Sequence, residues 1–318
     1  MDWKKIFREY LETCDRDPLN IEKAQKLKIA NLPRYLYKYR QANEFSLNNL
    51  EEDTVWLNSP SDYNDPFEFY ENIDFKQLNT AITKKHFEEL IGKMTSKIDI
   101  QREIIDQAKN TDEPLEVIGR ALMKKNNEDD LKVDMFFKFI SDIFEEHSKK
   151  MLSYKLQFMQ ESMRVSSFCE DHNQFLMWSH YADSHKGFCI EYDLSLWKKG
   201  DLRKRILFPV VYQDDVYNST PHLLKSTYGE DFNNLYPIIS GSTKSSQWEY
   251  EKEWRFIIPM GNSFPRQNYP MNCQSRVILG SKISEDNKKT ILDICSKKNL
   301  PVFKANLSGG YSLQIEKI

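Results

Sequence analysis

Three carboxylates recur at every second residue in the string WEYEKEWRFIIP, where Glu249, Glu251 and Glu253 alternate with aromatic and basic residues. Because successive side chains of a β-strand point to opposite faces, this spacing predicts all three carboxylates on one face of a strand. Crowded like charges raise the pKa of a carboxyl group. A carboxylate in an aromatic cleft can stabilise a cationic transition state or orient a hydroxyl. A solvated strand face explains the same pattern.

Two further strings carry residues that could bind or orient a ligand. In YLYKYR, Arg40 next to Tyr39 is suited to hold a phosphate or a ribose edge through paired hydrogen bonds. An exposed strand with cations lying along apolar surface gives the same pattern. In RVSSFCE, the hydroxyls of Ser166 and Ser167 could face a ligand, although two adjacent serines are also common in ordinary strands.

Histidine and acidic residues do not make a convincing metal site. The spacing of His180 and His185 matches no familiar pair of ligands, and a position near the end of a capped helix explains them more simply. Asp65 and Glu68 could supply oxygen ligands, but NDP is also a common turn string. We therefore expect no metal.

Composition indicates a compact globular protein of 318 residues with a formal net charge of -3, too small for a general nucleic-acid or membrane binder. With 40% hydrophobic and 13% aromatic residues, the chain can bury a large core. No apolar run approaches the roughly 18–20 residues of a membrane span. The N-terminus lacks a signal-peptide core, so we expect a cytoplasmic protein with no membrane partner. Five cysteines without a CxxC pair indicate free thiols.

The elements that must position these residues point to an α+β fold with a mixed or antiparallel β core. An N-terminal helical segment is expected over 1–33 and the α+β core over 34–318, interrupted by a mainly helical insertion at about 75–163. A strand, a helix that Ser284 can cap and two more strands should end the chain. The predicted core strands lie near 36–40, 54–58, 164–168, 187–193, 205–212 and 253–258.

The chain resembles the bacterial family catalogued as domain of unknown function 2971, over roughly residues 36 to 315. Four strings carry the resemblance: LYKYR, VWLNSPSDYNDPFE, SSFCEDHNQFLMWSHYADSHKGFCIEYD and WEYEKEWRF. The family's name assigns no function. The resemblance implies a role in prokaryotic conflict, including antiviral defence.

The order of three motifs is also similar to that of ADP-ribosyltransferases of the arginine-serine-glutamate type. Those enzymes carry an Arg on the first core strand, a Ser-x-Ser on a middle strand and a Glu-x-Glu at the start of a later strand. Here Arg40, the Ser166 and Ser167 pair, and Glu251 and Glu253 follow in that order. The chain differs from the family in its adjacent serines and in the long helical stretch between the first two motifs.

This second resemblance implies a split β-sheet and NAD as substrate, whose cleavage passes through an oxocarbenium-like centre. A carboxylate at the ribose would stabilise that centre more than the ground state. The acceptor of ADP-ribose would be a macromolecule, protein or nucleic acid, that the sequence does not identify. The implied roles are Glu253 as the essential carboxylate, Glu251 acting on the acceptor, Ser166 supporting Glu253, Arg40 and His180 holding NAD, and Tyr37 or Tyr39 stacking on nicotinamide.

Two other classes of function stay open, so the sequence does not decide whether the protein is an enzyme. A non-catalytic sensor would bind a peptide or small ligand in an aromatic cleft around Trp178, Tyr181 and Trp248. A metal-dependent nuclease would hold Mg²⁺ through Asp65, Glu68, Glu191 and Asp193. The oligomeric state is not predicted.

Overall fold

The computed structural model describes residues 2–229, 233–261, 265–310 and 312–318. The chain forms two compact units, each assembled from segments that are distant in sequence. The second unit comprises Glu71–Gln157 and Tyr217–Tyr236. The first unit comprises Met1–Tyr70, Phe158–Val216 and Pro237–Ile318.

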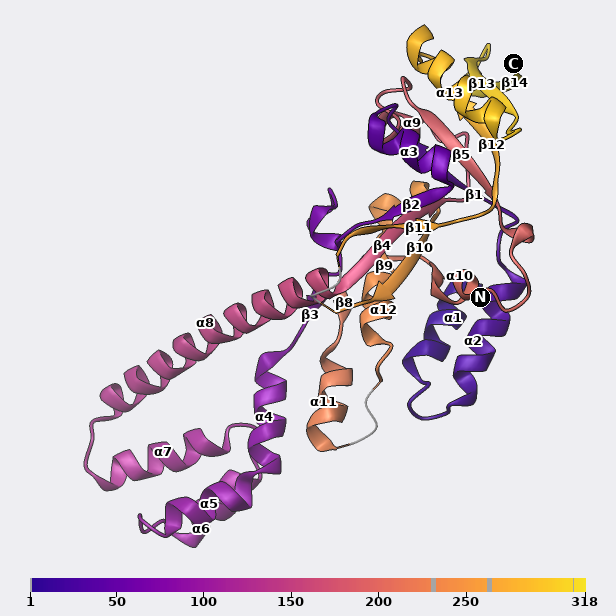
Figure 1. Ribbon diagram of the computed structural model, residues 1–318. Coiled ribbons are helices and arrows are strands. Elements are labelled where there is room, and N and C mark those ends of the chain that lie inside the picture. The colour runs from indigo at the N-terminus through magenta and orange to yellow at the C-terminus, as the bar shows by residue number, and fades with distance from the viewer. Residues whose placement is uncertain (1, 230–232, 262–264, 311) are drawn as a thin grey trace. The chain divides into compact units, whose positions relative to one another are not determined.

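The first unit is built on a sheet with eight strands among its described residues (Figure 1). Neighbouring strands are antiparallel except β12 and β13, which are parallel. The predicted α+β class is therefore confirmed. Across the sheet the order is β14 (Leu313–Lys317), β13 (Val302–Leu307), β12 (Gln274–Leu279), β5 (Phe188–Asp193), β1 (Tyr35–Arg40), β4 (Met163–Cys169), β10 (Glu253–Pro259) and β6 (Leu207–Pro209).

The sheet opens between β1 and β4. These two strands pair at a single register position, Tyr37 opposite Cys169, and then diverge. By contrast, β1 pairs with β5 at six positions and β4 pairs with β10 at seven. Beyond that position, side chains of β1 and β4, and not backbone hydrogen bonds, border the space between the two strands.

Successive side chains along the strands point to opposite faces of the sheet, and each face carries its own apolar cluster. Leu36 and Ile190 pack in the larger cluster with Phe256, whereas Tyr39 and Cys189 pack in the smaller one with Trp178. Gly187 allows the loop before β5 to approach β1, because a Cβ there would lie 2.1 Å from the carbonyl oxygen of Arg40.

Helices and short strands complete the first unit. Two N-terminal helices come first, and the side chain of Ser284 caps the last helix, as predicted. The elements are α1 (Trp3–Glu12), α2 (Leu19–Ala30), α3 (Glu44–Glu52), β2 (Thr54–Leu57) paired with β11 (Gln267–Pro270), η1 (Pro60–Asp62), α9 (Phe175–Tyr181), η2 (Leu194–Leu196), α10 (Leu202–Ile206), β7 (Val211–Gln213) paired with β9 (Thr243–Ser245), α12 (Tyr236–Gly241), η3 (Ser246–Glu251) and α13 (Glu285–Lys297).

The second unit is mainly helical, and the structure has helices but no strand between residues 75 and 162. Its core packs Phe87, Ile91 and Ile118 together. None of the helices in the described part of the chain combines the length and the apolar character that crossing a membrane requires. The elements are β3 (Glu71–Asn72) paired with β8 (Tyr217–Asn218), α4 (Phe75–Lys85), α5 (Phe87–Thr95), α6 (Arg102–Lys109), α7 (Pro114–Lys125), α11 (Thr220–Tyr228) and α8 (Asp130–Ser162), which ends beyond this unit.

Three predicted strands differ from the structure. The strand expected over WEYEKEWRFIIP is the 3-10 helix η3 followed by β10, so Glu249, Glu251 and Glu253 do not share a strand face. The strand expected over 205–212 is divided among α10, β6 and β7, and β6, which ends at Pro209, lies at the edge of the sheet. The strand expected near 54–58 is β2, which pairs with β11 outside the large sheet.

Candidate functional site

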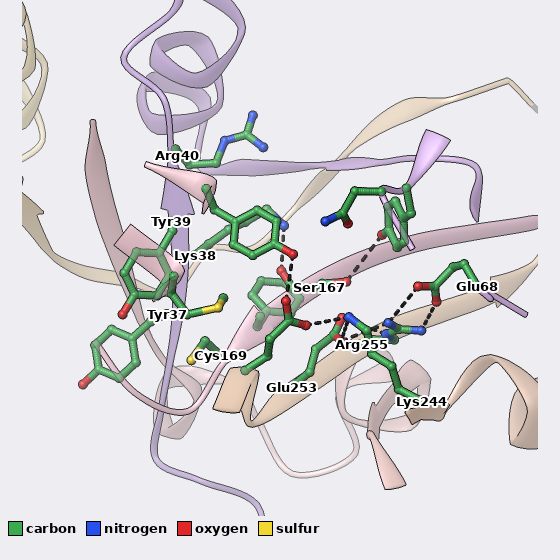
Figure 2. A pocket seen from close by; sticks show the side chains of 16 residues that line it. Tyr37, Lys38, Tyr39, Arg40, Glu68, Ser167, Cys169, Lys244, Glu253 and Arg255 are labelled. Carbon is green, nitrogen blue, oxygen red and sulfur yellow. Dashed lines mark hydrogen bonds and ion pairs between the residues drawn. The ribbon is translucent and has the colours of Figure 1, made fainter. Parts of the chain in front are cut away.

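A cavity of about 180 Å³ lies in the first unit, where β1 and β4 diverge (Figure 2). Residues from both strands line it, and residues of β9, η3 and β10 line it as well. Charged and phenolic side chains predominate. The lining residues are Tyr37, Lys38, Tyr39, Arg40, Tyr63, Asn64, Glu68, Ser167, Phe168, Cys169, Met177, Tyr181, Lys244, Glu251, Glu253 and Arg255.

Buried charges of alternating sign run along one wall of the cavity. The Arg255 guanidinium donates to both oxygens of Glu253, at 2.7 and 2.9 Å, and also to Glu68. The Lys244 ammonium donates to Glu251 at 2.6 Å and to Glu253 at 3.3 Å. Because every charge has a neighbour of opposite sign, their attraction offsets the cost of removing these charges from water.

The pKa values of the two central carboxyl groups are shifted in opposite directions. Burial alone would raise the pKa of Glu253, but the charges of Arg255 and Lys244 outweigh burial and bring that pKa to about 2. Burial raises the pKa of Glu251, and repulsion from Glu253 adds to the effect against the attraction of Lys244. Glu253 is therefore a fixed negative charge, while Glu251 takes up a proton more readily than Glu253 does.

Tyr181 extends the network into the cavity. Its hydroxyl donates to Glu251 at 2.7 Å, and burial followed by the charge of Glu251 raises the pKa of that phenol. Glu251 and Tyr181 thus form a hydrogen-bonded acid-base pair at the cavity wall, next to Lys244.

Lys38 bridges the opening between β1 and β4. Its ammonium donates to the Ser166 hydroxyl at 2.9 Å and to the Ser167 carbonyl oxygen at 2.7 Å, and it lies 5.0 Å from the centre of the Phe168 ring. No ion pair joins Lys38 to a carboxylate of the described chain. Burial, with a smaller effect of the Arg40 charge, lowers the pKa of Lys38 to about 7.

Most of the predicted site residues line this cavity, but several of their polar groups are used elsewhere. The Tyr37 hydroxyl donates to Glu191 and the Tyr39 hydroxyl to the backbone of Asp171. The Arg40 guanidinium donates to Asn49 at 3.1 Å, and Figure 2 shows it pointing away from Glu253. The polar groups of these three residues therefore have partners that are not among the residues lining the cavity.

Two predicted residues are not among those lining the cavity. Ser166 is buried and accepts from Lys38, whereas the neighbouring Ser167 lines the cavity and lowers the pKa of Glu253 by a hydrogen bond. His180 is exposed on α9, where its ring contacts Tyr181.

The residues considered for the other two functions have partners of their own. Glu191 accepts from Tyr37 and Arg276, and Asp193 accepts from Arg34. The described residues include no group of three or more His, Cys, Asp or Glu side chains that could hold a metal ion. Trp178 is fully buried, so it offers no exposed aromatic surface.

Sequence reasoning missed Lys38, Lys244 and Arg255 as members of the site, and it considered Glu68 only as a metal ligand. Arg255 directly follows the EKEW string, two residues after Glu253, and a strand places these two side chains on one face. That spacing was a usable signal. Nothing in the sequence placed Glu68 or Lys244 beside β10, because only the fold brings them there.

A family model described as "Protein of unknown function (DUF2971)" matches residues 177–256. Over this segment the chain is similar to the DUF2971 family. The DUF2971 segment contains one wall of the cavity, including Lys244, Glu251 and Glu253, whereas Lys38 and Ser167 precede it. No curated protein and no solved structure matches the chain. The similarity to ADP-ribosyltransferases stays a prediction.

Proposed function

We propose that the protein cleaves NAD at the bond between nicotinamide and ribose, as an ADP-ribosyltransferase or an NAD glycohydrolase. The observation that supports this most directly is the sheet order. The strands with the three motifs, β1, β4 and β10, are neighbours, and all three contribute side chains to one cavity. The opening between β1 and β4 is also what a split sheet would require.

The two carboxyl groups have properties suited to this reaction. The ionised Glu253 places a fixed negative charge at the cavity, which favours an oxocarbenium-like centre over the neutral ground state. Glu251, with its raised pKa and its bond to Tyr181, is suited to accept a proton from the attacking hydroxyl or water. These roles match those that the resemblance implies.

The size of the cavity limits which part of NAD it could enclose. At about 180 Å³ it is smaller than the roughly 300–1,000 Å³ of pockets that bury a drug-sized ligand. It would hold the nicotinamide or its ribose, and the adenine half would lie outside. A macromolecular acceptor, a cytoplasmic location and a part in antiviral defence belong to this proposal.

The test is nicotinamide release from NAD by purified protein, with protein, DNA and RNA supplied as acceptors. We expect Glu251→Gln to lower turnover by about 10²-fold or more, because it removes proton exchange and charge together. Glu249→Gln is the matched control, since Glu249 lies on the same 3-10 helix but is exposed. The proposal fails if the wild type neither binds NAD nor releases nicotinamide with any acceptor.

A further inference from the structure

Lys38 is a half-buried lysine that lines the cavity without an ion pair to any carboxylate among the described residues. Lys244 also lines the cavity, but it pairs with two carboxylates, whose charges raise its pKa. Lys28 is fully buried, donates to the carbonyl oxygen of Arg205 and is not among the residues that line the cavity. Lys38 therefore combines an amine that has only uncharged hydrogen-bond partners with access to a small cavity.

The surroundings of Lys38 favour a neutral amine, because burial and the charge of Arg40 lower its pKa more than the charge of Glu253 raises it. Its two hydrogen-bond partners, Ser166 and the carbonyl oxygen of Ser167, are uncharged, and an aromatic ring flanks it. With a pKa of about 7, roughly half of the amine is neutral at neutral pH. An ordinary lysine of pKa near 10.4 is neutral to less than about one part in 10³ there. A desolvated neutral amine is the usual form of a nucleophilic lysine.

We propose that Lys38 is a covalent attachment site for the carbonyl carbon of a small hydroxylated aldehyde, including the open form of a reducing sugar. The amine nitrogen bonds to the carbonyl carbon, and the carbonyl oxygen takes up a proton to give a carbinolamine. The hydroxyl then departs as water, with a proton that the amine has released, and a carbon–nitrogen double bond forms. No electrons are gained or lost in this step.

The rest of the cavity accounts for the preference for hydroxyl groups. Tyr181, Glu251 and Asn64 present hydroxyl, carboxyl and amide groups at its wall, and hydroxyls on a ligand can pair with them. The volume of about 180 Å³ suits a molecule of a few carbon atoms or a single sugar. The proposal stands without the NAD reaction, since it concerns only the amine and its cavity.

The experiment supplies glycolaldehyde, the smallest hydroxylated aldehyde, with cyanoborohydride to reduce any imine, and locates the adducts by peptide mass spectrometry. At pH 7 and limiting reagent, we expect Lys38 to be labelled at least 10-fold more than the average exposed lysine. Its labelling should level off above about pH 8, while that of exposed lysines continues to rise. Lys28 should stay unlabelled because it lies outside the cavity.

Two comparisons make the result decisive. Propionaldehyde, of similar size but without the hydroxyl, should label Lys38 clearly less than glycolaldehyde does. Lys38→Arg keeps a cation but cannot form an imine, so the selective adduct should disappear while the circular dichroism spectrum is retained. Labelling of Lys38 no greater than that of exposed lysines, or equal labelling by both aldehydes, would overturn the proposal. NAD is absent from these reactions, so their outcome is separate from the test of NAD cleavage.

Discussion

Arg255 is fully buried between two carboxylates, and its guanidinium also donates to the carbonyl oxygen of Gly241 at 2.8 Å. A buried cation of this kind depends on its partners, because the energy of removing it from water is recovered only through them. The residues that give the cavity its charge are therefore also residues on which the stability of the first unit depends. Activity measurements on Glu253 need a stability measurement beside them.

Glu253→Gln should destabilise the protein by about 3–5 kcal/mol, because Gln leaves Arg255 and Lys244 without their shared negative charge. Urea unfolding of wild type and variant measures this difference. The matched control is Glu249→Gln, which should change stability by less than about 0.5 kcal/mol, as is usual for an exposed position. Equal effects of the two substitutions would contradict the structure of the charge cluster.

The contribution of Glu253 to the stability of the folded protein should also depend on pH. Its pKa of about 2 in the folded protein is below the ordinary value near 4.3. Its stabilising effect is thus complete above about pH 5 and is lost as the pH falls toward 2. The raised pKa of Glu251 has the opposite effect on how stability changes with pH, but Glu251 is present in both the wild type and Glu253→Gln. We expect the stability gap between wild type and Glu253→Gln to narrow between pH 5 and 3 in a series of urea titrations.

At the scale of elements, the sequence predicted three central strands of the large sheet well. The expected bounds 36–40, 164–168 and 253–258 agree with β1, β4 and β10 to within one residue at each end. The prediction failed where local backbone geometry decided the outcome. Ser245 caps η3, and Lys252 then adopts the left-handed conformation at φ 44°, which ends the helix before β10. Alternation alone does not reveal such a change of backbone.

The candidate site was predictable only in part, for a related reason. Motif order identified the strands that reach the cavity, including the segment with Glu251 and Glu253. It could not show that Lys38, rather than Arg40, directs its charge into the opening, because that depends on where β1 and β4 separate. Nor could it bring Glu68 to Arg255 across 187 residues of chain.

Gly187→Ala should destabilise the first unit by roughly 3 kcal/mol, since overpacking against backbone is costly and cannot be relieved by a side-chain rotation. Its Cβ would lie 2.1 Å from the carbonyl oxygen of Arg40 and 3.0 Å from that of Ala182. Thermal melting of the variant measures the effect. Gly92→Ala is the contrasting case, with open space around a helical position in α5, and it should stabilise by about 0.5–1 kcal/mol. A melting point for Gly187→Ala at or above that of the wild type would contradict the close approach.

At the scale of the whole molecule, the cavity and every residue that lines it belong to the first unit. The second unit has a separate apolar core on α5, α6 and α7. The chemistry proposed for Glu251 and Lys38 therefore calls on no side chain of the second unit. Substitutions in the core of the second unit, such as Ile118→Ala, should leave the labelling of Lys38 by glycolaldehyde unchanged.

The division into two units also decides which spectroscopic signals report on which part of the chain. All six tryptophans and all five cysteines of the sequence fall in the segments of the first unit. The cysteines are buried, so their thiols should react with a labelling reagent only when that unit opens. Tryptophan fluorescence and thiol labelling should then follow a single transition in urea. Far-UV circular dichroism, to which helices α4 to α8 contribute strongly, should show a further change wherever the second unit unfolds at a different urea concentration.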